Sequence, residues 1–222
     1  MPELVIFDCD GVLVDSERLA IRVDAEFLAE MGWVMTEAEA AERFVGLSMV
    51  QVRHQVESHF GRTLPPEWED EFQERLREAF VSELVPVQGI VEALDAMRHD
   101  TCVASSGTHE KIKFSLTLVG LYDRFAGRIF SATEVPRGKP APDLFLHAAQ
   151  RMRADPSQCV VIEDSVPGVT AALAAGMRVL AYAGSVTAAG KLERRGAVVF
   201  DDMRDLPALL ESVGDTERGA GF

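Results

Sequence analysis

Residues 5–17 read VIFDCDGVLVDSE, and this stretch indicates the fold most directly. It opens with three consecutive apolar residues, which is typical of a strand buried on both faces of a parallel sheet. Asp8 and Asp10 follow at once, and side chains two apart along a strand point to the same side. An ordinary turn would explain Asp10 and Gly11 but not Asp8. Two neighbouring carboxylates at the end of a core strand must be paired, protonated or bound to a metal, so the stretch indicates a reactive or metal-binding site.

The composition is that of a globular protein with an acidic surface. The chain has 222 residues, of which 47% are hydrophobic and 26% charged, and its formal net charge is −14. This charge argues against a nucleic acid or an anionic membrane as partner. No stretch approaches the roughly 20 apolar residues of a membrane span. The start of the chain also lacks a basic region followed by an apolar run and a cleavage site, so we expect a cytoplasmic protein.

The chain shows two different sequence patterns in succession. From about residue 16 to 84 the apolar spacing is helical, with a capping-box pattern at 36–39. From residue 86 onward short apolar runs alternate with helical segments, which is typical of βαβ units and a parallel sheet. We therefore predict an α/β fold with a Rossmann-like parallel sheet. Residues 1–14 and 86–222 would form the catalytic core, and residues 15–85 an inserted α-helical cap domain.

Later strands of the predicted sheet also end in polar residues, and ligands of open α/β sheets bind beyond the carboxyl ends of the strands. One apolar run leads into Ser105 and Ser106, followed by Gly-Thr, which fits either an anion site or a simple helix N-cap by Ser106 or Thr108. Another leads to Lys139, which lies between glycine and proline. This lysine is either a solvated loop residue or a cation held by a constrained backbone.

A second acidic strand end completes the set. Glu163 and Asp164 close the run CVVI, where an N-cap by Asp164 or Ser165 is the structural explanation. Together with Asp8 and Asp10, these acids would instead form an oxygen-only cluster suited to Mg²⁺. Carboxylates, hydroxyls and a lysine at the ends of one sheet are the groups that phosphoryl transfer requires: a nucleophile, fixed donors and neutralising cations.

The ordered motifs DCDGVLVDSE, ASSGT, GKPAPDLF and VIEDSVPGV resemble those of the haloacid dehalogenase-like superfamily. Within it, they are most similar to the β-phosphoglucomutase and sugar-phosphate phosphatase branch, whose members carry a helical cap. The resemblance covers nearly the whole chain. It implies Mg²⁺ as cofactor and an aspartyl-phosphate intermediate. The second aspartate, Asp10, points to phosphoryl chemistry, since dehalogenases of the superfamily lack it as an acid and base.

The resemblance also implies roles for the residues of the core. Asp8 matches the nucleophile that becomes the aspartyl-phosphate. Asp10 matches the general acid and base, and its backbone carbonyl would contact Mg²⁺. Lys139 matches the lysine that neutralises the nucleophile and the phosphate. Asp164 matches the metal-binding aspartate, and Glu163 is a neighbouring acid close to the metal. The implied metal site therefore consists of Asp8, Asp10, Glu163 and Asp164.

The remaining implied contacts are with the substrate. Ser105 matches the hydroxyl that binds the phosphoryl oxygens, with Ser106 beside it. Gly46, Leu47 and Ser48 resemble the cap loop that reaches down to the substrate. The core motifs thus predict the chemistry, whereas the identity of the substrate depends on cap residues that the sequence does not place.

Two positions differ from the mutase members. Ala20 stands where those enzymes carry a histidine in the first cap helix, and Met49 stands where an arginine follows the Gly-x-Ser of the cap loop. We therefore predict an Mg²⁺-dependent phosphatase that acts, as a monomer, on a small sugar phosphate or related phosphomonoester. The alternatives are a sugar phosphomutase and a binding protein on a retired catalytic scaffold. A retired site would be expected to lose its motif residues, and this chain has kept them.

Overall fold

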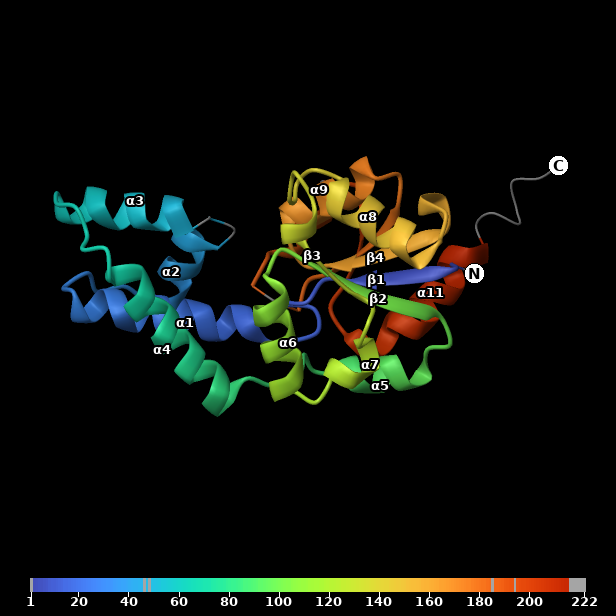
Figure 1. The fold of residues 1–222 in the computed structure, drawn as a ribbon, viewed down its shortest axis with the longest axis horizontal. Coiled ribbons are helices and arrows are strands. Elements are labelled where there is room, and N and C mark those ends of the chain that lie inside the picture. The colour runs from blue at the N-terminus through green and yellow to red at the C-terminus, as the bar shows by residue number, and fades with distance from the viewer. Residues whose placement is uncertain (1, 46, 48, 185, 194, 216–222) are drawn as a thin grey trace. The chain divides into compact units, whose positions relative to one another are not determined.

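The computed structural model describes residues 2–45, 47, 49–184, 186–193 and 195–215 (Figure 1). The chain divides into two compact units. One unit combines Met1–Asp15 with Val85–Phe222, and the other is Ser16–Leu84.

The first unit is built on a six-stranded sheet in which all neighbouring strands pair in parallel. The strand order is β3-β2-β1-β4-β5-β6. The strands are β1 (Leu4–Phe7), β2 (Asp100–Ser105), β3 (Ile129–Ser131), β4 (Cys159–Glu163), β5 (Arg178–Tyr182) and β6 (Val198–Phe200). This parallel sheet confirms the predicted α/β, Rossmann-like fold class.

The central strand β1 is buried along its whole length, as its continuous apolar sequence predicts. Ile6 pairs with Cys102 of β2 on one side and with Val161 of β4 on the other. The same registers bring the carboxyl ends of β1, β2 and β4 to one edge of the sheet, where Asp8 and the acids after β4 emerge.

Helices cover both faces of this sheet (Figure 1). α8 (Asp143–Met152), α9 (Val166–Ala174) and α10 (Ala189–Glu193) share a core with the strands on one face. On the other face lie α5 (Ile90–Ala96), α7 (Tyr122–Phe125) and α11 (Leu206–Asp215), where the rings of Phe7 and Phe125 meet edge-on at 6.1 Å. The further helix α6 (His109–Leu118) follows β2.

The second unit is helical. Its elements are α1 (Ser16–Glu30), α2 (Glu37–Phe44), α3 (Met49–Phe60) and α4 (Trp68–Glu83). Phe27 of α1 packs against Trp68 and Phe72 of α4, with 5.8 Å between ring centroids in both pairs. Thr36 and Glu39 form the capping box that the sequence predicts at the start of α2.

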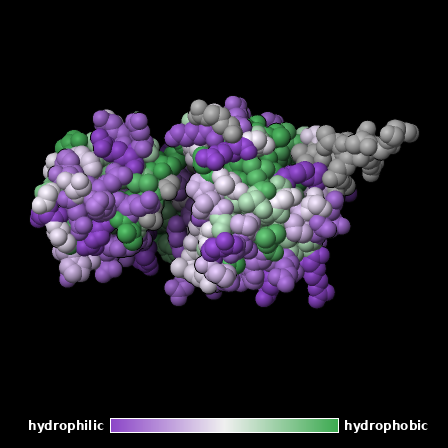
Figure 2. Space-filling model, turned by 90° about the horizontal axis from the view of Figure 1, so that it is seen from above, coloured by the Kyte–Doolittle hydropathy of each residue, from purple (hydrophilic) through white to green (hydrophobic). Residues whose placement is uncertain are grey.

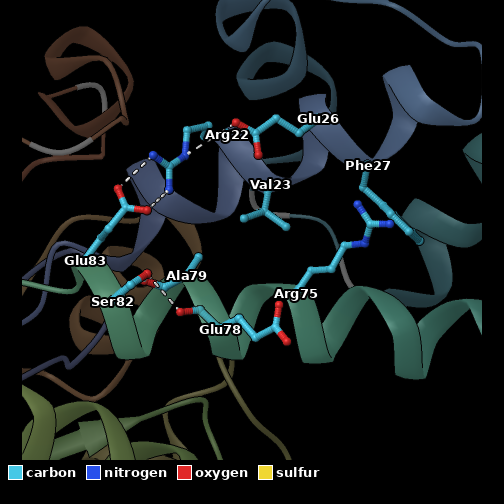
Figure 3. Close-up of a pocket in the computed structure, with 9 residues that line it drawn as sticks. All are labelled: Arg22, Val23, Glu26, Phe27, Arg75, Glu78, Ala79, Ser82 and Glu83. Carbon is cyan, nitrogen blue, oxygen red and sulfur yellow. Dashed lines mark hydrogen bonds and ion pairs between the residues drawn. The ribbon is translucent and has the colours of Figure 1, made fainter.

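A shallow cavity of about 290 Å³ lies within this helical unit, between α1 and α4 (Figure 3). Arg22 and Glu83 form a bidentate pair across it, with N–O distances of 2.8 and 2.6 Å. Arg75 donates to Glu30 at 2.7 Å and to Glu71 at 3.2 Å. The arginines of this cavity are therefore already paired with carboxylates of the same unit, and such exposed pairs contribute little to stability.

Within the described part of the chain, no helix has both the length and the apolar character needed to cross a membrane. On the face drawn in Figure 2, hydrophilic residues alternate with smaller apolar patches.

Candidate active site

The turn that follows β1 presents the two aspartates of the first motif. The Asp8 amide donates to the carbonyl of Ile162 at 3.0 Å, which extends the pairing of β1 with β4 by one residue. The amides of Leu13 and Val14 both donate to the Cys9 carbonyl, at 2.9 and 3.1 Å. The chain therefore reverses directly after Asp8, and the local backbone hydrogen bonds fix the direction in which the aspartates leave the sheet.

A buried ammonium group joins the ends of β1 and β4. Lys139 Nζ lies 2.8 Å from Asp8 Oδ1 and 2.6 Å from Glu163 Oε1. The side chain of Lys139 is only 4% exposed and that of Glu163 is fully buried. The Lys139 ammonium group also lies over the ring of Phe145 in α8, with 4.9 Å between Nζ and the ring centroid. The loop lysine of the sequence is therefore a fixed cation and not a solvated one.

Three buried carboxylates gather around this ammonium group. Oxygen atoms of Asp8, Glu163 and Asp164 all lie within 4.8 Å of one another. Glu163 is doubly engaged, because its Oε2 also accepts hydrogen bonds of 2.8 Å from the amide and the hydroxyl of Ser165. Ser165 in turn caps α9, which resolves the choice of N-cap in favour of the serine.

The cluster holds more negative charge than Lys139 balances. Burial raises the pKa of Asp8 to about 7 against the attraction of Lys139, while Glu163 and Asp10 act in the same direction as burial. Burial opposes the charge of the Lys139 ammonium, but the neighbouring Asp8 and Glu163 carboxylates raise its pKa above the ordinary value. Lys139 is therefore permanently charged, and the acids around it favour a further cation.

The serines at the end of β2 lie at the same edge of the sheet. Phe7 pairs with Val103, so the chain segments carrying Asp8 and Ser105 leave neighbouring strands side by side. Ser105 is buried and its Oγ accepts a hydrogen bond of 3.1 Å from the Gly107 amide. Ser106 is exposed. Thr108 is the N-cap of α6, which resolves the choice between Ser106 and Thr108.

One residue of the site was missed by the sequence analysis. Lys111, in the first turn of α6, donates from Nζ to Asp10 Oδ2 at 2.8 Å. Its side chain is 45% exposed and that of Asp10 is 20% exposed. The sequence offered only one indirect signal, the spacing of three residues between Lys111 and its capping residue Thr108.

Comparison with known proteins agrees with this geometry. Residues 2–176 match the family model described as haloacid dehalogenase-like hydrolase. The chain belongs to the haloacid dehalogenase-like hydrolases. The predicted family is therefore confirmed.

Relatives of this haloacid dehalogenase-like hydrolase include phosphatases. The 6-phosphogluconate phosphatase of Escherichia coli (strain K12) is 33% identical over 81% of this chain and 82% of its own length. A haloacid dehalogenase-like protein of unknown function from Agrobacterium tumefaciens str. C58 is 37% identical, with a TM-score of 0.89 over 96% of this chain and all of that one. A hydrolase of the HAD family from Deinococcus radiodurans R1, solved with bound phosphate and sodium, is 33% identical, with a TM-score of 0.83 and coverage of 96% of both chains. The predicted enzyme class, a phosphoric monoester hydrolase, is confirmed by these relatives.

In the structure, the core residues that the sequence predicts for the site come together at one edge of the sheet. They are Asp8, Asp10, Ser105, Lys139, Glu163 and Asp164. The cap-loop residues are a separate matter. Gly46 and Ser48 lie outside the described residues, and Leu47 follows α2 with its amide donating to the Phe44 carbonyl at 3.0 Å. Their predicted contact with substrate stays a prediction.

Proposed function

We propose that this hydrolase is an Mg²⁺-dependent phosphatase of small sugar phosphates or related phosphomonoesters, with Asp8 as its nucleophile. The observation that carries the proposal is the buried Lys139 ammonium held between Asp8 and Glu163, with Asp164 in the same cluster. A structural ion pair needs one carboxylate. A third buried carboxylate is costly unless a further cation completes the site.

The donor set fits Mg²⁺, which prefers carboxylate and carbonyl oxygens. In our proposal Asp8, Asp164 and the backbone carbonyl of Asp10 hold the ion. Both Glu163 oxygens already accept hydrogen bonds, one from Lys139 and the other from Ser165. Glu163 would therefore act near the ion without binding it directly, by holding Lys139 in place. When bound, Mg²⁺ would withdraw charge from the phosphoryl oxygens and from the carboxylates around them.

The first chemical step forms a covalent intermediate. A carboxylate oxygen of Asp8 attacks phosphorus as the bond from phosphorus to the sugar oxygen breaks. Asp10, protonated at this stage, donates its proton to the departing oxygen, which leaves as an alcohol. Lys139 offsets the charge of the nucleophile and the phosphoryl group, and the Ser105 region supplies donors to the phosphoryl oxygens.

The second step returns the enzyme to its starting state. Asp10, now a carboxylate, takes a proton from water as that water attacks phosphorus. The bond from phosphorus to Asp8 breaks and inorganic phosphate leaves. Asp10 is then protonated again and Asp8 is again a carboxylate, so each proton and each bond is accounted for over the cycle.

A phosphorylated sugar or sugar acid is the substrate class we favour, on the strength of the 6-phosphogluconate phosphatase relative. We assign substrate selection to residues 15–85 as a cap domain, including Gly46, Leu47 and Ser48. The monomeric state and the cytoplasmic location stay predictions. Ala20 and Met49, which replace the mutase histidine and arginine, favour hydrolysis over isomerisation.

The test is phosphate release from a panel of phosphorylated sugars, sugar acids and small organic acids, with Mg²⁺ and with a chelator. We expect metal-dependent release, with the highest kcat/KM on a sugar or sugar-acid phosphate. Isomerisation of β-glucose 1-phosphate with a bisphosphate primer, without free phosphate, would instead identify a mutase. No turnover in either assay would favour the binding protein.

A further inference from the structure

The proposed acid and base of the site has an ammonium group of its own. Lys111 Nζ donates to Asp10 Oδ2 at 2.8 Å, although the two residues are 101 positions apart in the sequence. Lys139, in contrast, pairs with Asp8 and Glu163. One lysine of the site thus pairs with the proposed nucleophile, and another pairs with the proposed acid and base.

The backbone that carries Lys111 is fixed at the edge of the site. Thr108 Oγ1 accepts from the Lys111 amide at 3.2 Å, which places the lysine in the capped first turn of α6. The next residue, Ile112, is buried in the core and anchors the helix. A Cβ atom at Gly107 would lie 3.4 Å from Cδ of Lys111 and 3.6 Å from Oγ of Ser105. The lysine stem therefore runs past the glycine of the serine loop on its way to Asp10.

This ion pair is poorly suited to a purely stabilising role. Both side chains retain contact with solvent, and exposed pairs of this kind contribute little to stability. The pair can affect the reaction rate far more than stability, because a small misplacement of a proton donor such as Asp10 has a large effect on rate. A carboxylate on a turn, with rotatable side-chain bonds, gains a defined direction from a donor that is itself anchored on a helix.

We infer that Lys111 is a positioning residue for Asp10: it holds the carboxyl group in the orientation from which the proton reaches the leaving oxygen. The inference rests on the proposed function, since it requires Asp10 to move that proton. Lys111 acts through Asp10 and makes no bond to the reacting atoms.

The same helix offers a matched control. Lys113 has the same charge and lies two residues further along α6, but its Nζ lies 5.4 Å from the ring centroid of Tyr122 and so serves a different contact. Lys113→Met removes one positive charge from α6, as Lys111→Met does, and leaves the contact with Asp10 in place.

The experiment compares two substrates of the purified full chain with Mg²⁺. The preferred sugar phosphate has a leaving alkoxide that needs a proton, whereas the nitrophenolate of p-nitrophenyl phosphate leaves without one. For Lys111→Met we expect kcat on the sugar phosphate to fall about 10- to 100-fold with KM within about twofold. Nitrophenolate release in the first turnover should change by less than about threefold, Lys111→Arg should restore most of kcat, and Lys113→Met should match the wild type.

A double-mutant cycle decides whether Lys111 acts through Asp10. In the Asp10→Asn background, adding Lys111→Met should change the remaining rate by less than about twofold, because the group that Lys111 orients is gone. If Lys111→Met instead lowers the rate by the same factor in both backgrounds, the two substitutions act independently and the inference is overturned. A rise in KM with unchanged kcat would also overturn it, since Lys111 would then bind substrate directly. Wild-type turnover by Asp10→Asn alone would contradict the proposed function instead.

Discussion

A Cβ atom on Gly11 would lie 2.0 Å from Oδ2 of Asp164. The turn after β1 therefore contacts the end of β4 at a point where only a hydrogen atom fits. Gly11 also has φ of +75°, a conformation that other residues rarely adopt. The glycine of the first motif thus sets the position of the aspartate that we propose as a metal ligand.

Gly11→Ala should displace Asp164 and weaken metal activation. We expect turnover to fall at least about tenfold, and the Mg²⁺ concentration for half-maximal activity to rise, in addition to about 1 kcal/mol of backbone strain. Gly120→Ala is the matched control, because Gly120 has φ of +72° but no atom within 4 Å of the added Cβ. A Gly11→Ala variant with wild-type Mg²⁺ dependence would show that the close contact does not position Asp164.

Lys139→Met should destabilise the fold as well as abolish activity. The substitution leaves Asp8 and Glu163 buried without their shared cation, and breaking a buried pair in this way costs about 3–5 kcal/mol. Urea unfolding measures the change in the free energy of unfolding. Arg137→Met is the control from the same loop, since Arg137 is 71% exposed in its pair with Asp143 and its loss should change the free energy of unfolding little. Equal effects of the two substitutions would contradict the account of a desolvated site.

The carboxyl group of Asp24, in α1 of the helical unit, should make stability depend on pH. Burial raises the pKa of Asp24 from 3.8 to about 7, and Glu17 acts in the same direction. The folded state then binds more protons than the unfolded state between these values, so stability falls as pH rises through that window. We expect the Tm of the wild type to fall relative to that of Asp24→Asn between about pH 4 and pH 7.

The control for Asp24 is Glu26→Gln on the same helix, where the side chain is 66% exposed. Its Tm difference from the wild type should vary less with pH. A constant Tm difference between the wild type and Asp24→Asn across this range would show that burial does not raise the pKa of the Asp24 carboxyl group.

The sequence predicted the sheet and most of the core site because both depend on local pattern. Continuous apolar runs identify buried parallel strands, and polar residues directly after such runs must meet at one edge. Asp8 and Asp164 could be found in this way, whereas Lys139 stood out by its place between glycine and proline in the loop after β3. Which of two adjacent acids faces which partner is a tertiary question: Glu163 meets Lys139, while Asp164 meets Gly11.

Lys111 could not be found by the same reasoning. Its contact with Asp10 depends on where α6 begins, and the sequence left the capping residue open between Ser106 and Thr108. The cap at Thr108 sets the helical register, and the register directs Lys111 toward the site. The cap does not by itself place α6 beside the turn after β1, so the pairing of these two residues also depends on the packing of α6 on the sheet.

The most direct test of the account is phosphate release by Asp8→Asn with Mg²⁺ and the preferred substrate, after thermal unfolding has shown that the variant is folded. We predict that release falls to the background rate, because the variant keeps the shape of the side chain but loses the nucleophilic carboxylate. Wild-type turnover by folded Asp8→Asn would contradict the account, since no aspartyl-phosphate could then form at the end of β1.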